Sequence, residues 1–381
     1  MSHTVPPTQD FVARSPHYQA RRKGRYIVVE LVDPHQALST SAYGGGQRDD
    51  LRYLVNHQSC EGSGHNERFE LLMELGDEGY HRQVCSELEL PPETVALMGT
   101  AANMAYAGTA AASHAELSVQ AIVTAGVEGN AGTAGDPARW HESDAGWAAS
   151  NPNSGTINTT VLINWPLTPA ALARAVTTAT EGKTAALQEL AISSRYSADM
   201  ATGTGTDQYC IAALSDAQKT PKTNSGHHAK LGELIGSTVR QATREALRWQ
   251  NGLEASYTRG LAHALRRFGF SEERCWQELE NRLDEKLFAL IKKNAKPVLF
   301  EPQVAAAAYA FAAVWDRVHY GTLPAALAAP LLRQQAATLA SSLAAKNESW
   351  PQCHAALHFD AENPLAIVYD ALACGWRQKW I

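Results

Sequence analysis

The sequence predicts an α/β core domain, or a mixed α+β one, followed by a mainly α-helical C-terminal region. Up to about residue 250, β-branched apolar runs alternate with helical segments, which is typical of a mixed fold. Beyond that point the chain is rich in Ala, Leu, Arg and Trp, and little strand pattern remains. We therefore expect a polar N-terminal tail at 1–25, a core domain at 26–250 and a helical extension at 251–381.

Composition and charge exclude several classes of protein. The 381 residues are 45% hydrophobic and 19% charged, as in a globular protein that buries a sizeable core. The net charge of −6 provides no basic field, so we expect no nucleic-acid partner. No window approaches about 18 consecutive apolar residues, so we expect no membrane partner. Residues 1–20 also lack the apolar centre of a secretory signal.

The cysteines and histidines form no metal-binding pattern. Six cysteines are scattered without a Cys-x-x-Cys pair or a zinc-ligand spacing, which suits reduced thiols and predicts a cytoplasmic protein. His227 and His228 are adjacent, and helical neighbours point about 100° apart, so the two cannot bind one ion together. The sequence therefore predicts no metal ligand set.

Strands and turns alternate along the core domain. Pro91 and Pro92 end a helix that we expect in the later part of 66–90. Gly44–Gly46 is interpreted as a hairpin turn, although three glycines are also able to cradle an anion. The expected strands are 25–32, 51–55, 95–102, 118–125, 156–165 and 209–214.

The first long helix of the core carries a lysine among apolar side chains. Thr168 and Pro169 mark its start, with threonine as the cap and proline at the first helical position. At 100° per residue, Lys183 falls on the apolar face and Glu181 on the far side. Lys183 must therefore snorkel to solvent, pair with a buried acid or line a cavity.

The second long helix is expected from about His227 to Trp249, capped by Asn224-Ser225-Gly226. Gly232 and Gly236 allow a neighbour to approach it closely. His227 would lie at the helix start on the core side, where the free N–H groups disfavour imidazolium. A neutral His227 is a candidate general base, and a plain capping role is the alternative.

Helical periodicity continues through 258–268, 273–293, 303–318 and 324–346. The stretch 304–314 is apolar all round, which suits a buried helix or a partner interface. The C-terminal helices are therefore the expected contact surface of a homo-oligomer.

The polar side chains of the core domain gather in Gly-rich segments, where glycine permits sharp turns and close approach to a ligand. They include carboxylates, amides, hydroxyls, a lysine and a histidine, but no Gly-x-Ser-x-Gly, Ser-x-x-Lys or His-Glu-x-x-His motif. Such a set suits hydrolysis of an amide or ester, in which one group activates water or a threonine and amides hold the oxyanion. It equally suits recognition of an amide-rich ligand.

Several ordered segments of the core resemble one known family, the adenosylcobinamide amidohydrolases (CbiZ), over roughly residues 26–250. Shorter matches, SAYGGG (41–46), LVNH (54–57) and MGTAA (98–102), occur in the expected order. The main segments are GVEGNAGTAGD (126–136), GTINTTVLIN (155–164), ATEGKTAAL (179–187), ATGTGTD (201–207) and GHHAKLGELIG (226–236).

The resemblance implies hydrolysis of the aminopropanol amide of adenosylcobinamide to adenosylcobyric acid, which can re-enter adenosylcobalamin synthesis. The corrinoid is then the substrate and partner, and no cofactor is implied. A wide Gly-lined pocket with Trp140, Trp147 and Trp165 nearby would agree with a macrocycle that carries many amides.

The motifs also supply candidate site residues. As a hypothesis, Asp207 or Glu128 is the acid or base, and His227 or Lys183 polarises the amide. Asn130, Asn158 and the turn from Thr202 to Thr206 would bind the amide or the oxyanion. The full candidate set for substrate binding is Asn56, Gly126, Asn130, Asn158, Thr202, Thr204, Thr206, Lys230 and Glu233.

Two other functions stay open at this point. One is a corrinoid-binding module without turnover, and the other is an amidohydrolase that acts on a different amide. The titratable groups among the motifs favour an enzyme, because a binding module has less need of them. The last 130 residues extend beyond the resemblance, so a partner contact or a second activity could reside there.

Overall fold

The computed structural model describes residues 11–60, 67–138, 140–143, 146–149 and 155–380. The chain divides into two compact units between Leu253 and Glu254, three residues after the boundary expected from composition. The first unit is mixed α/β and the second is helical, which confirms the predicted fold class.

One sheet of the first unit has five strands in the order β1-β2-β3-β6-β7. Only β6 and β7 run parallel, and the other neighbours are antiparallel. The expected N-terminal tail is wrong from residue 11 onward, because β1 pairs with β2, β2 pairs with β3, and Ala20 of β2 is buried. The strands are β1 (Phe11–Arg14), β2 (Tyr18–Lys23), β3 (Tyr26–Leu31), β6 (Tyr53–Gln58) and β7 (Val95–Thr100).

The other sheet has six strands in the order β5-β4-β13-β12-β9-β8. Here β12 and β13 are parallel and the rest antiparallel. Gly44 and Gly45 lie in the turn between β4 and β5, which confirms the hairpin interpretation. The strands are β4 (His35–Ser39), β5 (Gly46–Arg48), β8 (Gly108–His114), β9 (Leu117–Ala125), β12 (Ile157–Ile163) and β13 (Gln208–Leu214), and a separate hairpin joins β10 (Trp140–Ser143) to β11 (Gly146–Ala149).

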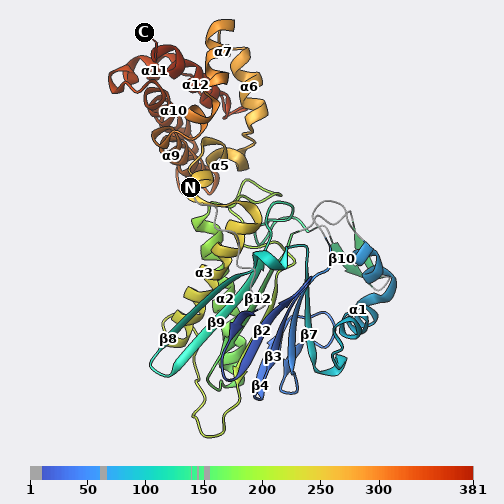
Figure 1. Ribbon diagram of the computed structural model, residues 1–381. Helices are drawn as coiled ribbons and strands as arrows, with labels where there is room; N and C mark the ends of the chain where they lie inside the picture. The colour runs from blue at the N-terminus through green and yellow to red at the C-terminus, as the bar shows by residue number, and fades with distance from the viewer. Residues whose placement is uncertain (1–10, 61–66, 139, 144–145, 150–154, 381) are drawn as a thin grey trace. The chain divides into compact units, whose positions relative to one another are not determined.

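The two large sheets pack face to face, and helices cover their outer faces. One apolar cluster joins β3 and β7 of one sheet to β9, β12 and β13 of the other. A second cluster joins α1 (Glu67–Leu88) to the outer face of β6 and β7. The helices α2 (Pro169–Glu189) and α3 (Lys230–Asn251) pack against each other and against the six-stranded sheet. Figure 1 shows α1 beside β7, and α2 and α3 beside β8 and β9, so the unit has four layers, α/β/β/α. Two short 3₁₀ turns complete it, η1 (Pro92–Thr94) and η2 (Met104–Tyr106).

The start of α2 was predicted correctly and that of α3 was not. Thr168 caps α2 through its hydroxyl, which accepts the Ala171 N–H at 3.3 Å. The helix α3 begins at Lys230, without a side-chain cap. Ser225 instead donates its hydroxyl to the Ala171 carbonyl of α2 at 2.6 Å. This contact holds the 225–229 segment against α2, so α3 begins only at Lys230.

The second unit contains only helices among its described residues, coloured from yellow to red in Figure 1. Val304, Phe311 and Ala312 of α9 lie in its apolar core, which confirms the buried-helix alternative for 304–314. The predicted helix at 273–293 is two helices, because Asp284 caps a new one by accepting the Leu287 N–H at 2.8 Å. The elements are α4 (Ala255–Thr258), α5 (Leu261–Leu265), η3 (Arg266–Phe268), α6 (Glu272–Glu280), α7 (Glu285–Lys293), α8 (Ala295–Leu299), α9 (Pro302–His319), η4 (Ala325–Leu327), α10 (Ala328–Ala344), η5 (Asn347–Ser349), α11 (Trp350–Ala356) and α12 (Ala366–Gln378).

None of the described helices combines the length and the apolar character needed to cross a bilayer.

Candidate functional site

The centre of the candidate site is an ion pair between Lys183 of α2 and Asp207, which precedes β13. Only 5% of the Lys183 side chain and 11% of the Asp207 side chain are exposed. The pairing confirms one of the three outcomes expected for a lysine on the apolar face of α2. Because a buried ion pair stabilises little by itself, its position calls for a reason beyond stability.

The Asp207 carboxylate is held by donors from a strand, a helix and a turn. Its Oδ1 accepts the Thr204 hydroxyl at 2.6 Å and the Ile157 N–H at 3.2 Å. Its Oδ2 accepts Lys183 and, at 3.4 Å, the Thr204 N–H. The parallel pairing of β12 and β13 brings Ile157 and Asp207 to the same end of the sheet. The carboxylate therefore ties together three of the motif segments.

The surroundings favour the charged form of Lys183. Burial acts to lower its pKa, but the negative charge of Asp207 and the neighbouring Tyr209 outweigh burial and leave the pKa raised. Tyr209 is itself buried, and its pKa is also raised. Lys183 is therefore an ammonium at neutral pH, where it can supply positive charge but cannot accept a proton.

Gly203 shows how closely the turn approaches the ion pair. A Cβ at this position would lie 2.3 Å from Asp207 Oδ2 and 2.7 Å from Lys183 Nζ. Only glycine leaves room for both charges beside the backbone. The glycine of the ATGTGTD segment is thus needed for the ion pair to form.

Three hydroxyls lie beside the ion pair. Thr206 Oγ1 is 2.9 Å from Thr156 Oγ1 and 3.3 Å from Thr204 Oγ1, and it donates to the Gly155 carbonyl at 2.8 Å. The Asn130 amide nitrogen donates to the same carbonyl at 3.2 Å and reaches Thr206 Oγ1 at 3.5 Å. Thr206 is exposed, whereas Thr204 is buried. The structure thus brings together Asn130, Lys183, Thr204, Thr206 and Asp207.

The segments 126–136 and 201–207 are fastened to each other. Gly132 and Gly203 form an antiparallel bridge, with Gly132 N–H donating to Gly203 O at 2.9 Å. The Thr202 hydroxyl accepts the Ala134 N–H at 2.8 Å. Thr202 therefore fixes one loop on the other, and this contact occupies its hydroxyl.

A further cluster, which the sequence reasoning missed, supports these loops from 192–200. Asp136 Oδ2 accepts the Thr133 N–H and the Ser194 hydroxyl, both at 2.7 Å. Burial acts to raise the Asp136 pKa, but hydrogen bonds from Ser197, Ser194 and Thr133 outweigh it and lower the pKa. The Tyr196 hydroxyl donates to Asn130 Oδ1 and so fixes the amide orientation. In the sequence, only the Asp of GTAGD and the Ser residues of AISSRYS point to this cluster, and these residue types are also typical of ordinary turns.

Asn56 and Asn158 lie between the two sheets and are buried. The Asn158 amide nitrogen donates to Asn56 Oδ1 at 2.9 Å and to Gly99 O at 3.0 Å. The Asn56 amide nitrogen donates to Thr124 Oγ1 at 2.8 Å. Asn56 lies inside β6 and not at its end, because the strand continues to Gln58. These two amides join the sheets beside the site and are not accessible to a large substrate.

Glu128 and Gly126 lie in the loop that carries Asn130. Glu128 is exposed, two residues before Asn130 in a turn closed by Ala131 N–H and Val127 O at 3.2 Å. Gly126 is partly buried and donates its N–H to Thr156 O at 3.1 Å. Both therefore border the site, and Glu128 supplies an exposed carboxylate there.

His227 does not join this cluster, and its expected place on the core side is wrong. The side chain is 61% exposed, and its Nδ1 lies 3.3 Å from Glu181 on the exposed face of α2. Lys183 lies on the opposite, buried face of the same helix. Lys230 and Glu233 pair with each other at 2.5 Å on the surface of α3. None of the three is brought to the ion pair.

Trp165, one of the three tryptophans expected near the site, is held elsewhere. Trp165 donates its ring N–H to Thr220 O at 2.9 Å and lies under Lys219 and Lys222. The side chains of Trp140 and Trp147 lie outside the described part of the structure. Among the described residues, no group of three or more His, Cys, Asp or Glu side chains is placed to hold a metal ion.

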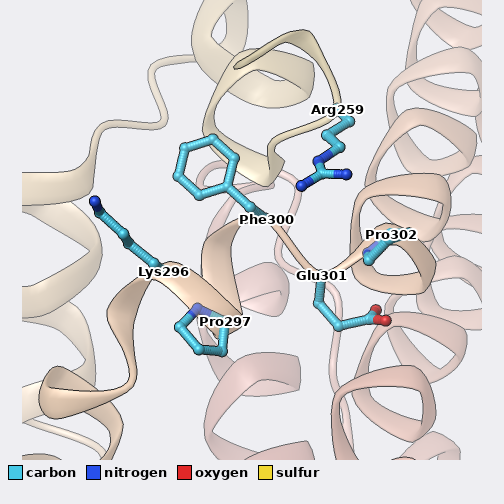
Figure 2. Close-up of a pocket in the computed structure, with 6 residues that line it drawn as sticks. All are labelled: Arg259, Lys296, Pro297, Phe300, Glu301 and Pro302. Carbon is cyan, nitrogen blue, oxygen red and sulfur yellow. The ribbon is translucent and has the colours of Figure 1, made fainter. Parts of the chain in front are cut away.

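A hollow of about 540 Å³ lies in the helical unit, between α4, α8 and the start of α9. Figure 2 shows Arg259, Lys296 and Glu301 around it, with the Phe300 ring. The Glu301 carboxylate accepts the Val304 N–H at 2.7 Å and so caps α9. None of the candidate site residues lines this hollow.

Comparisons with known proteins match the first unit to one family. The family model for adenosylcobinamide amidohydrolase (CbiZ) matches residues 8–255. An uncharacterized protein of Methanocaldococcus jannaschii is 36% identical over 177 residues, which is 44% of this chain and 68% of that protein.

Two solved structures show a weaker likeness. The PH0078 protein from Pyrococcus horikoshii has a TM-score of 0.31 and 12% identity, over 60% of this chain and 78% of its own. The L-aminopeptidase D-Ala-esterase/amidase from Ochrobactrum anthropi has a TM-score of 0.30 and 12% identity, over 63% and 81%. Both scores are too low to assign a fold or an activity.

The family model spans most of the first unit, including all five main motif segments and the Lys183–Asp207 pair. This chain therefore belongs to the adenosylcobinamide amidohydrolase family, to which it adds a helical C-terminal region.

Proposed function

We propose that this protein hydrolyses the aminopropanol amide of adenosylcobinamide, releasing aminopropanol and adenosylcobyric acid for corrinoid salvage. Family membership implies an amidohydrolase. The observation that carries the proposal is the meeting of three motif segments at one ion pair, with a fourth that reaches Thr206 beside it. Lys183 comes from 179–187, Ile157 from 155–164, Asp207 from 201–207 and Asn130 from 126–136.

The donors around Thr206 are of the kind that amide hydrolysis requires. The tetrahedral intermediate carries negative charge on the former carbonyl oxygen, and fixed N–H donors stabilise it. Asn130 supplies such a donor, because Tyr196 holds its oxygen and turns its nitrogen toward Thr206. The Lys183 ammonium makes the local field more positive.

Two carboxylates at the site take different roles in the proposal. Asp207 already accepts four hydrogen bonds, so it orders the turn and the Thr204 hydroxyl. Glu128 is exposed at the border of the site, which suits a group that contacts the leaving amine. There the Glu128 carboxylate would accept a hydrogen bond from the aminopropanol nitrogen and hold the amine in place as the C–N bond breaks.

The test is to incubate the full chain with adenosylcobinamide and to follow adenosylcobyric acid and free aminopropanol by mass spectrometry. We expect both products in equal amounts, and a loss of turnover in Glu128→Gln. A matched control is Glu233→Gln, which removes an exposed carboxylate paired to Lys230 away from the site. Equal losses in the two variants would contradict the role of Glu128.

The same incubation separates the other two functions. Tight corrinoid binding without product would favour a binding module. Release of a different amine from a corrinoid or another amide would favour an amidohydrolase with another substrate. If the protein neither bound nor turned over adenosylcobinamide, the proposal would be contradicted.

A further inference from the structure

The candidate site contains one hydroxyl that is both exposed and connected to the ion pair. Thr204 is 2% exposed and Thr156 is 9% exposed, so neither presents its oxygen to a large substrate. Thr206 is exposed, and its Oγ1 lies within 3.3 Å of both other hydroxyls. A threonine hydroxyl becomes a nucleophile only when a neighbouring group takes its proton. The contacts of Thr206 must therefore include a path for that proton.

Such a path leads from Thr206 to Asp207. The Thr204 hydroxyl donates to Asp207 Oδ1 at 2.6 Å, so its oxygen can accept a proton from elsewhere. Thr206 Oγ1 lies 3.3 Å from that oxygen. The Thr206 hydroxyl can rotate between the Gly155 carbonyl and Thr204, since rotation about its C–O bond costs little. The proton path therefore runs from Thr206 through Thr204 to Asp207, whose carboxylate is paired with Lys183.

Donors for an oxyanion surround the same hydroxyl. The Asn130 nitrogen is 3.5 Å from Thr206 Oγ1. Within the described residues, the backbone N–H groups of Gly205 and Thr206 donate no hydrogen bond. Gly205 has a positive φ of 74°, a left-handed backbone conformation that glycine adopts without strain. A carbonyl oxygen bound at the tip would meet these N–H groups as Thr206 attacks its carbon.

We propose that Thr206 is the nucleophile and that hydrolysis proceeds through an ester between Thr206 and the acyl group of the substrate. This inference rests on the proposed amide hydrolysis. In the first step, Thr206 Oγ1 bonds to the amide carbon. Its proton passes to Thr204, whose own proton passes to Asp207. The C–N bond then breaks, and the amine leaves with that proton, which Asp207 returns through the Thr204 hydroxyl.

Water completes the cycle. It attacks the ester carbon, its proton enters the same path, and the C–O bond to Thr206 breaks. The hydroxyl is restored and the acid is released, so the sum of the steps is amide plus water giving acid plus amine. No oxidant, metal or cofactor enters this balance.

The test compares Thr206→Val, Thr206→Ser and Thr177→Val in the full chain. Thr177 is an exposed threonine of α2 and serves as the matched control. Turnover of adenosylcobinamide should fall at least about 10³-fold in Thr206→Val, persist in Thr206→Ser and be unchanged in Thr177→Val. The melting temperatures of all three should match the wild type, because both positions are exposed.

Two further readouts detect the ester. In wild-type protein quenched with acid during turnover, peptide mass spectrometry should find the corrinoid acyl group on Thr206. A β-lactone, a strained ester that acylates activated hydroxyls, should modify Thr206 in the wild type but not in Lys183→Met. The β-lactone experiment does not depend on the corrinoid.

The outcomes separate the nucleophile from the substrate. If Thr206→Val turned over the substrate within about tenfold of wild type, Thr206 would not be the nucleophile, and the proposed function would still stand. If the β-lactone acylated Thr206 but adenosylcobinamide was not turned over, Thr206 would be supported as the nucleophile and adenosylcobinamide would be refuted as the substrate. A protein that neither turns over the corrinoid nor reacts with the β-lactone would contradict both.

Discussion

Each unit of the molecule contains a buried ion pair, and the two pairs differ in what surrounds them. In the helical unit, Arg267 binds Asp316 through two hydrogen bonds of 2.5 and 2.6 Å, with side chains 6% and 14% exposed. In the mixed unit, Lys183 and Asp207 are buried to nearly the same degree. Burial and charge alone therefore do not distinguish a functional pair from a structural one.

The neighbours of the two pairs do distinguish them. Beside the Arg267–Asp316 pair, the rings of Phe268 and Trp315 stack on each other with their centroids 4.7 Å apart. Both rings pack against the apolar core of the helical unit. The Lys183–Asp207 pair lies instead under a Gly-rich turn with three hydroxyls and an amide. The first environment stabilises a helix packing, and the second places polar groups where a ligand can reach them.

The largest expected effect comes from removing the cation of each pair in turn. Lys183→Met and Arg267→Met each leave a buried carboxylate uncompensated, which costs about 3–5 kcal/mol of stability in the unit concerned. Turnover of adenosylcobinamide should be lost in Lys183→Met and retained in folded Arg267→Met. Denaturant unfolding, with the two units followed as separate transitions, and product assays check this. Full activity in Lys183→Met would show that the Lys183–Asp207 pair has only a structural role, like the Arg267–Asp316 pair.

A methyl group tests how tightly the turn is fitted over the Lys183–Asp207 pair. Gly203→Ala places a Cβ 2.3 Å from Asp207, so the turn must move and turnover should fall about 10²-fold. Gly24→Ala is the control, because φ is +59° there and nothing lies within 4 Å of the added Cβ. It should cost about 1 kcal/mol of stability and leave the rate unchanged. Similar rates in both variants would show that the turn is not held in this conformation during catalysis.

The smallest effect is a difference in alkaline stability. The Lys183 pKa is raised above its ordinary value near 10.5, so folding favours the ammonium. Its contribution to stability is fully present below about pH 10.5 and is lost as pH rises through the folded pKa. Arginine stays charged in this range, so the other pair keeps its contribution. Urea unfolding of wild type and Lys183→Met between pH 8 and 11 should show an alkaline loss in the wild type that the variant lacks.

Local patterns in the sequence were sufficient for much of the secondary structure. The run TINTTVLINW is β-branched and apolar, and it forms the fully buried strand β12. Thr168 and Pro169 begin α2 because a cap and a fixed φ act within a few residues. By contrast, GTAAASH has no β-branched apolar pattern, and no strand is predicted there. It forms β8 because it pairs with β9, and Gly108 packs against α3, where a Cβ would lie 2.0 Å from Ala242 O.

The candidate site was predicted in part. Helical spacing alone placed Lys183 on a buried face, and a buried lysine needs a partner in any fold. Which acid pairs with it depends on the parallel register of β12 and β13, and no local pattern contains that register. His227 fails for a related reason, since the contact of Ser225 with α2 moves the start of α3 to Lys230.

The sequence by itself determined the family, the division into a mixed and a helical part, and the segments that carry polar chemistry. These follow from residue order, composition and periodicity, which are local properties of the chain. Only the tertiary structure decided that Asn56 and Asn158 join two sheets, that Asp136 and Tyr196 support the loops, and that Thr206 is the exposed hydroxyl. Each of these depends on contacts between residues 50 or more positions apart, and such contacts arise from the packing of layers rather than from any neighbouring residue.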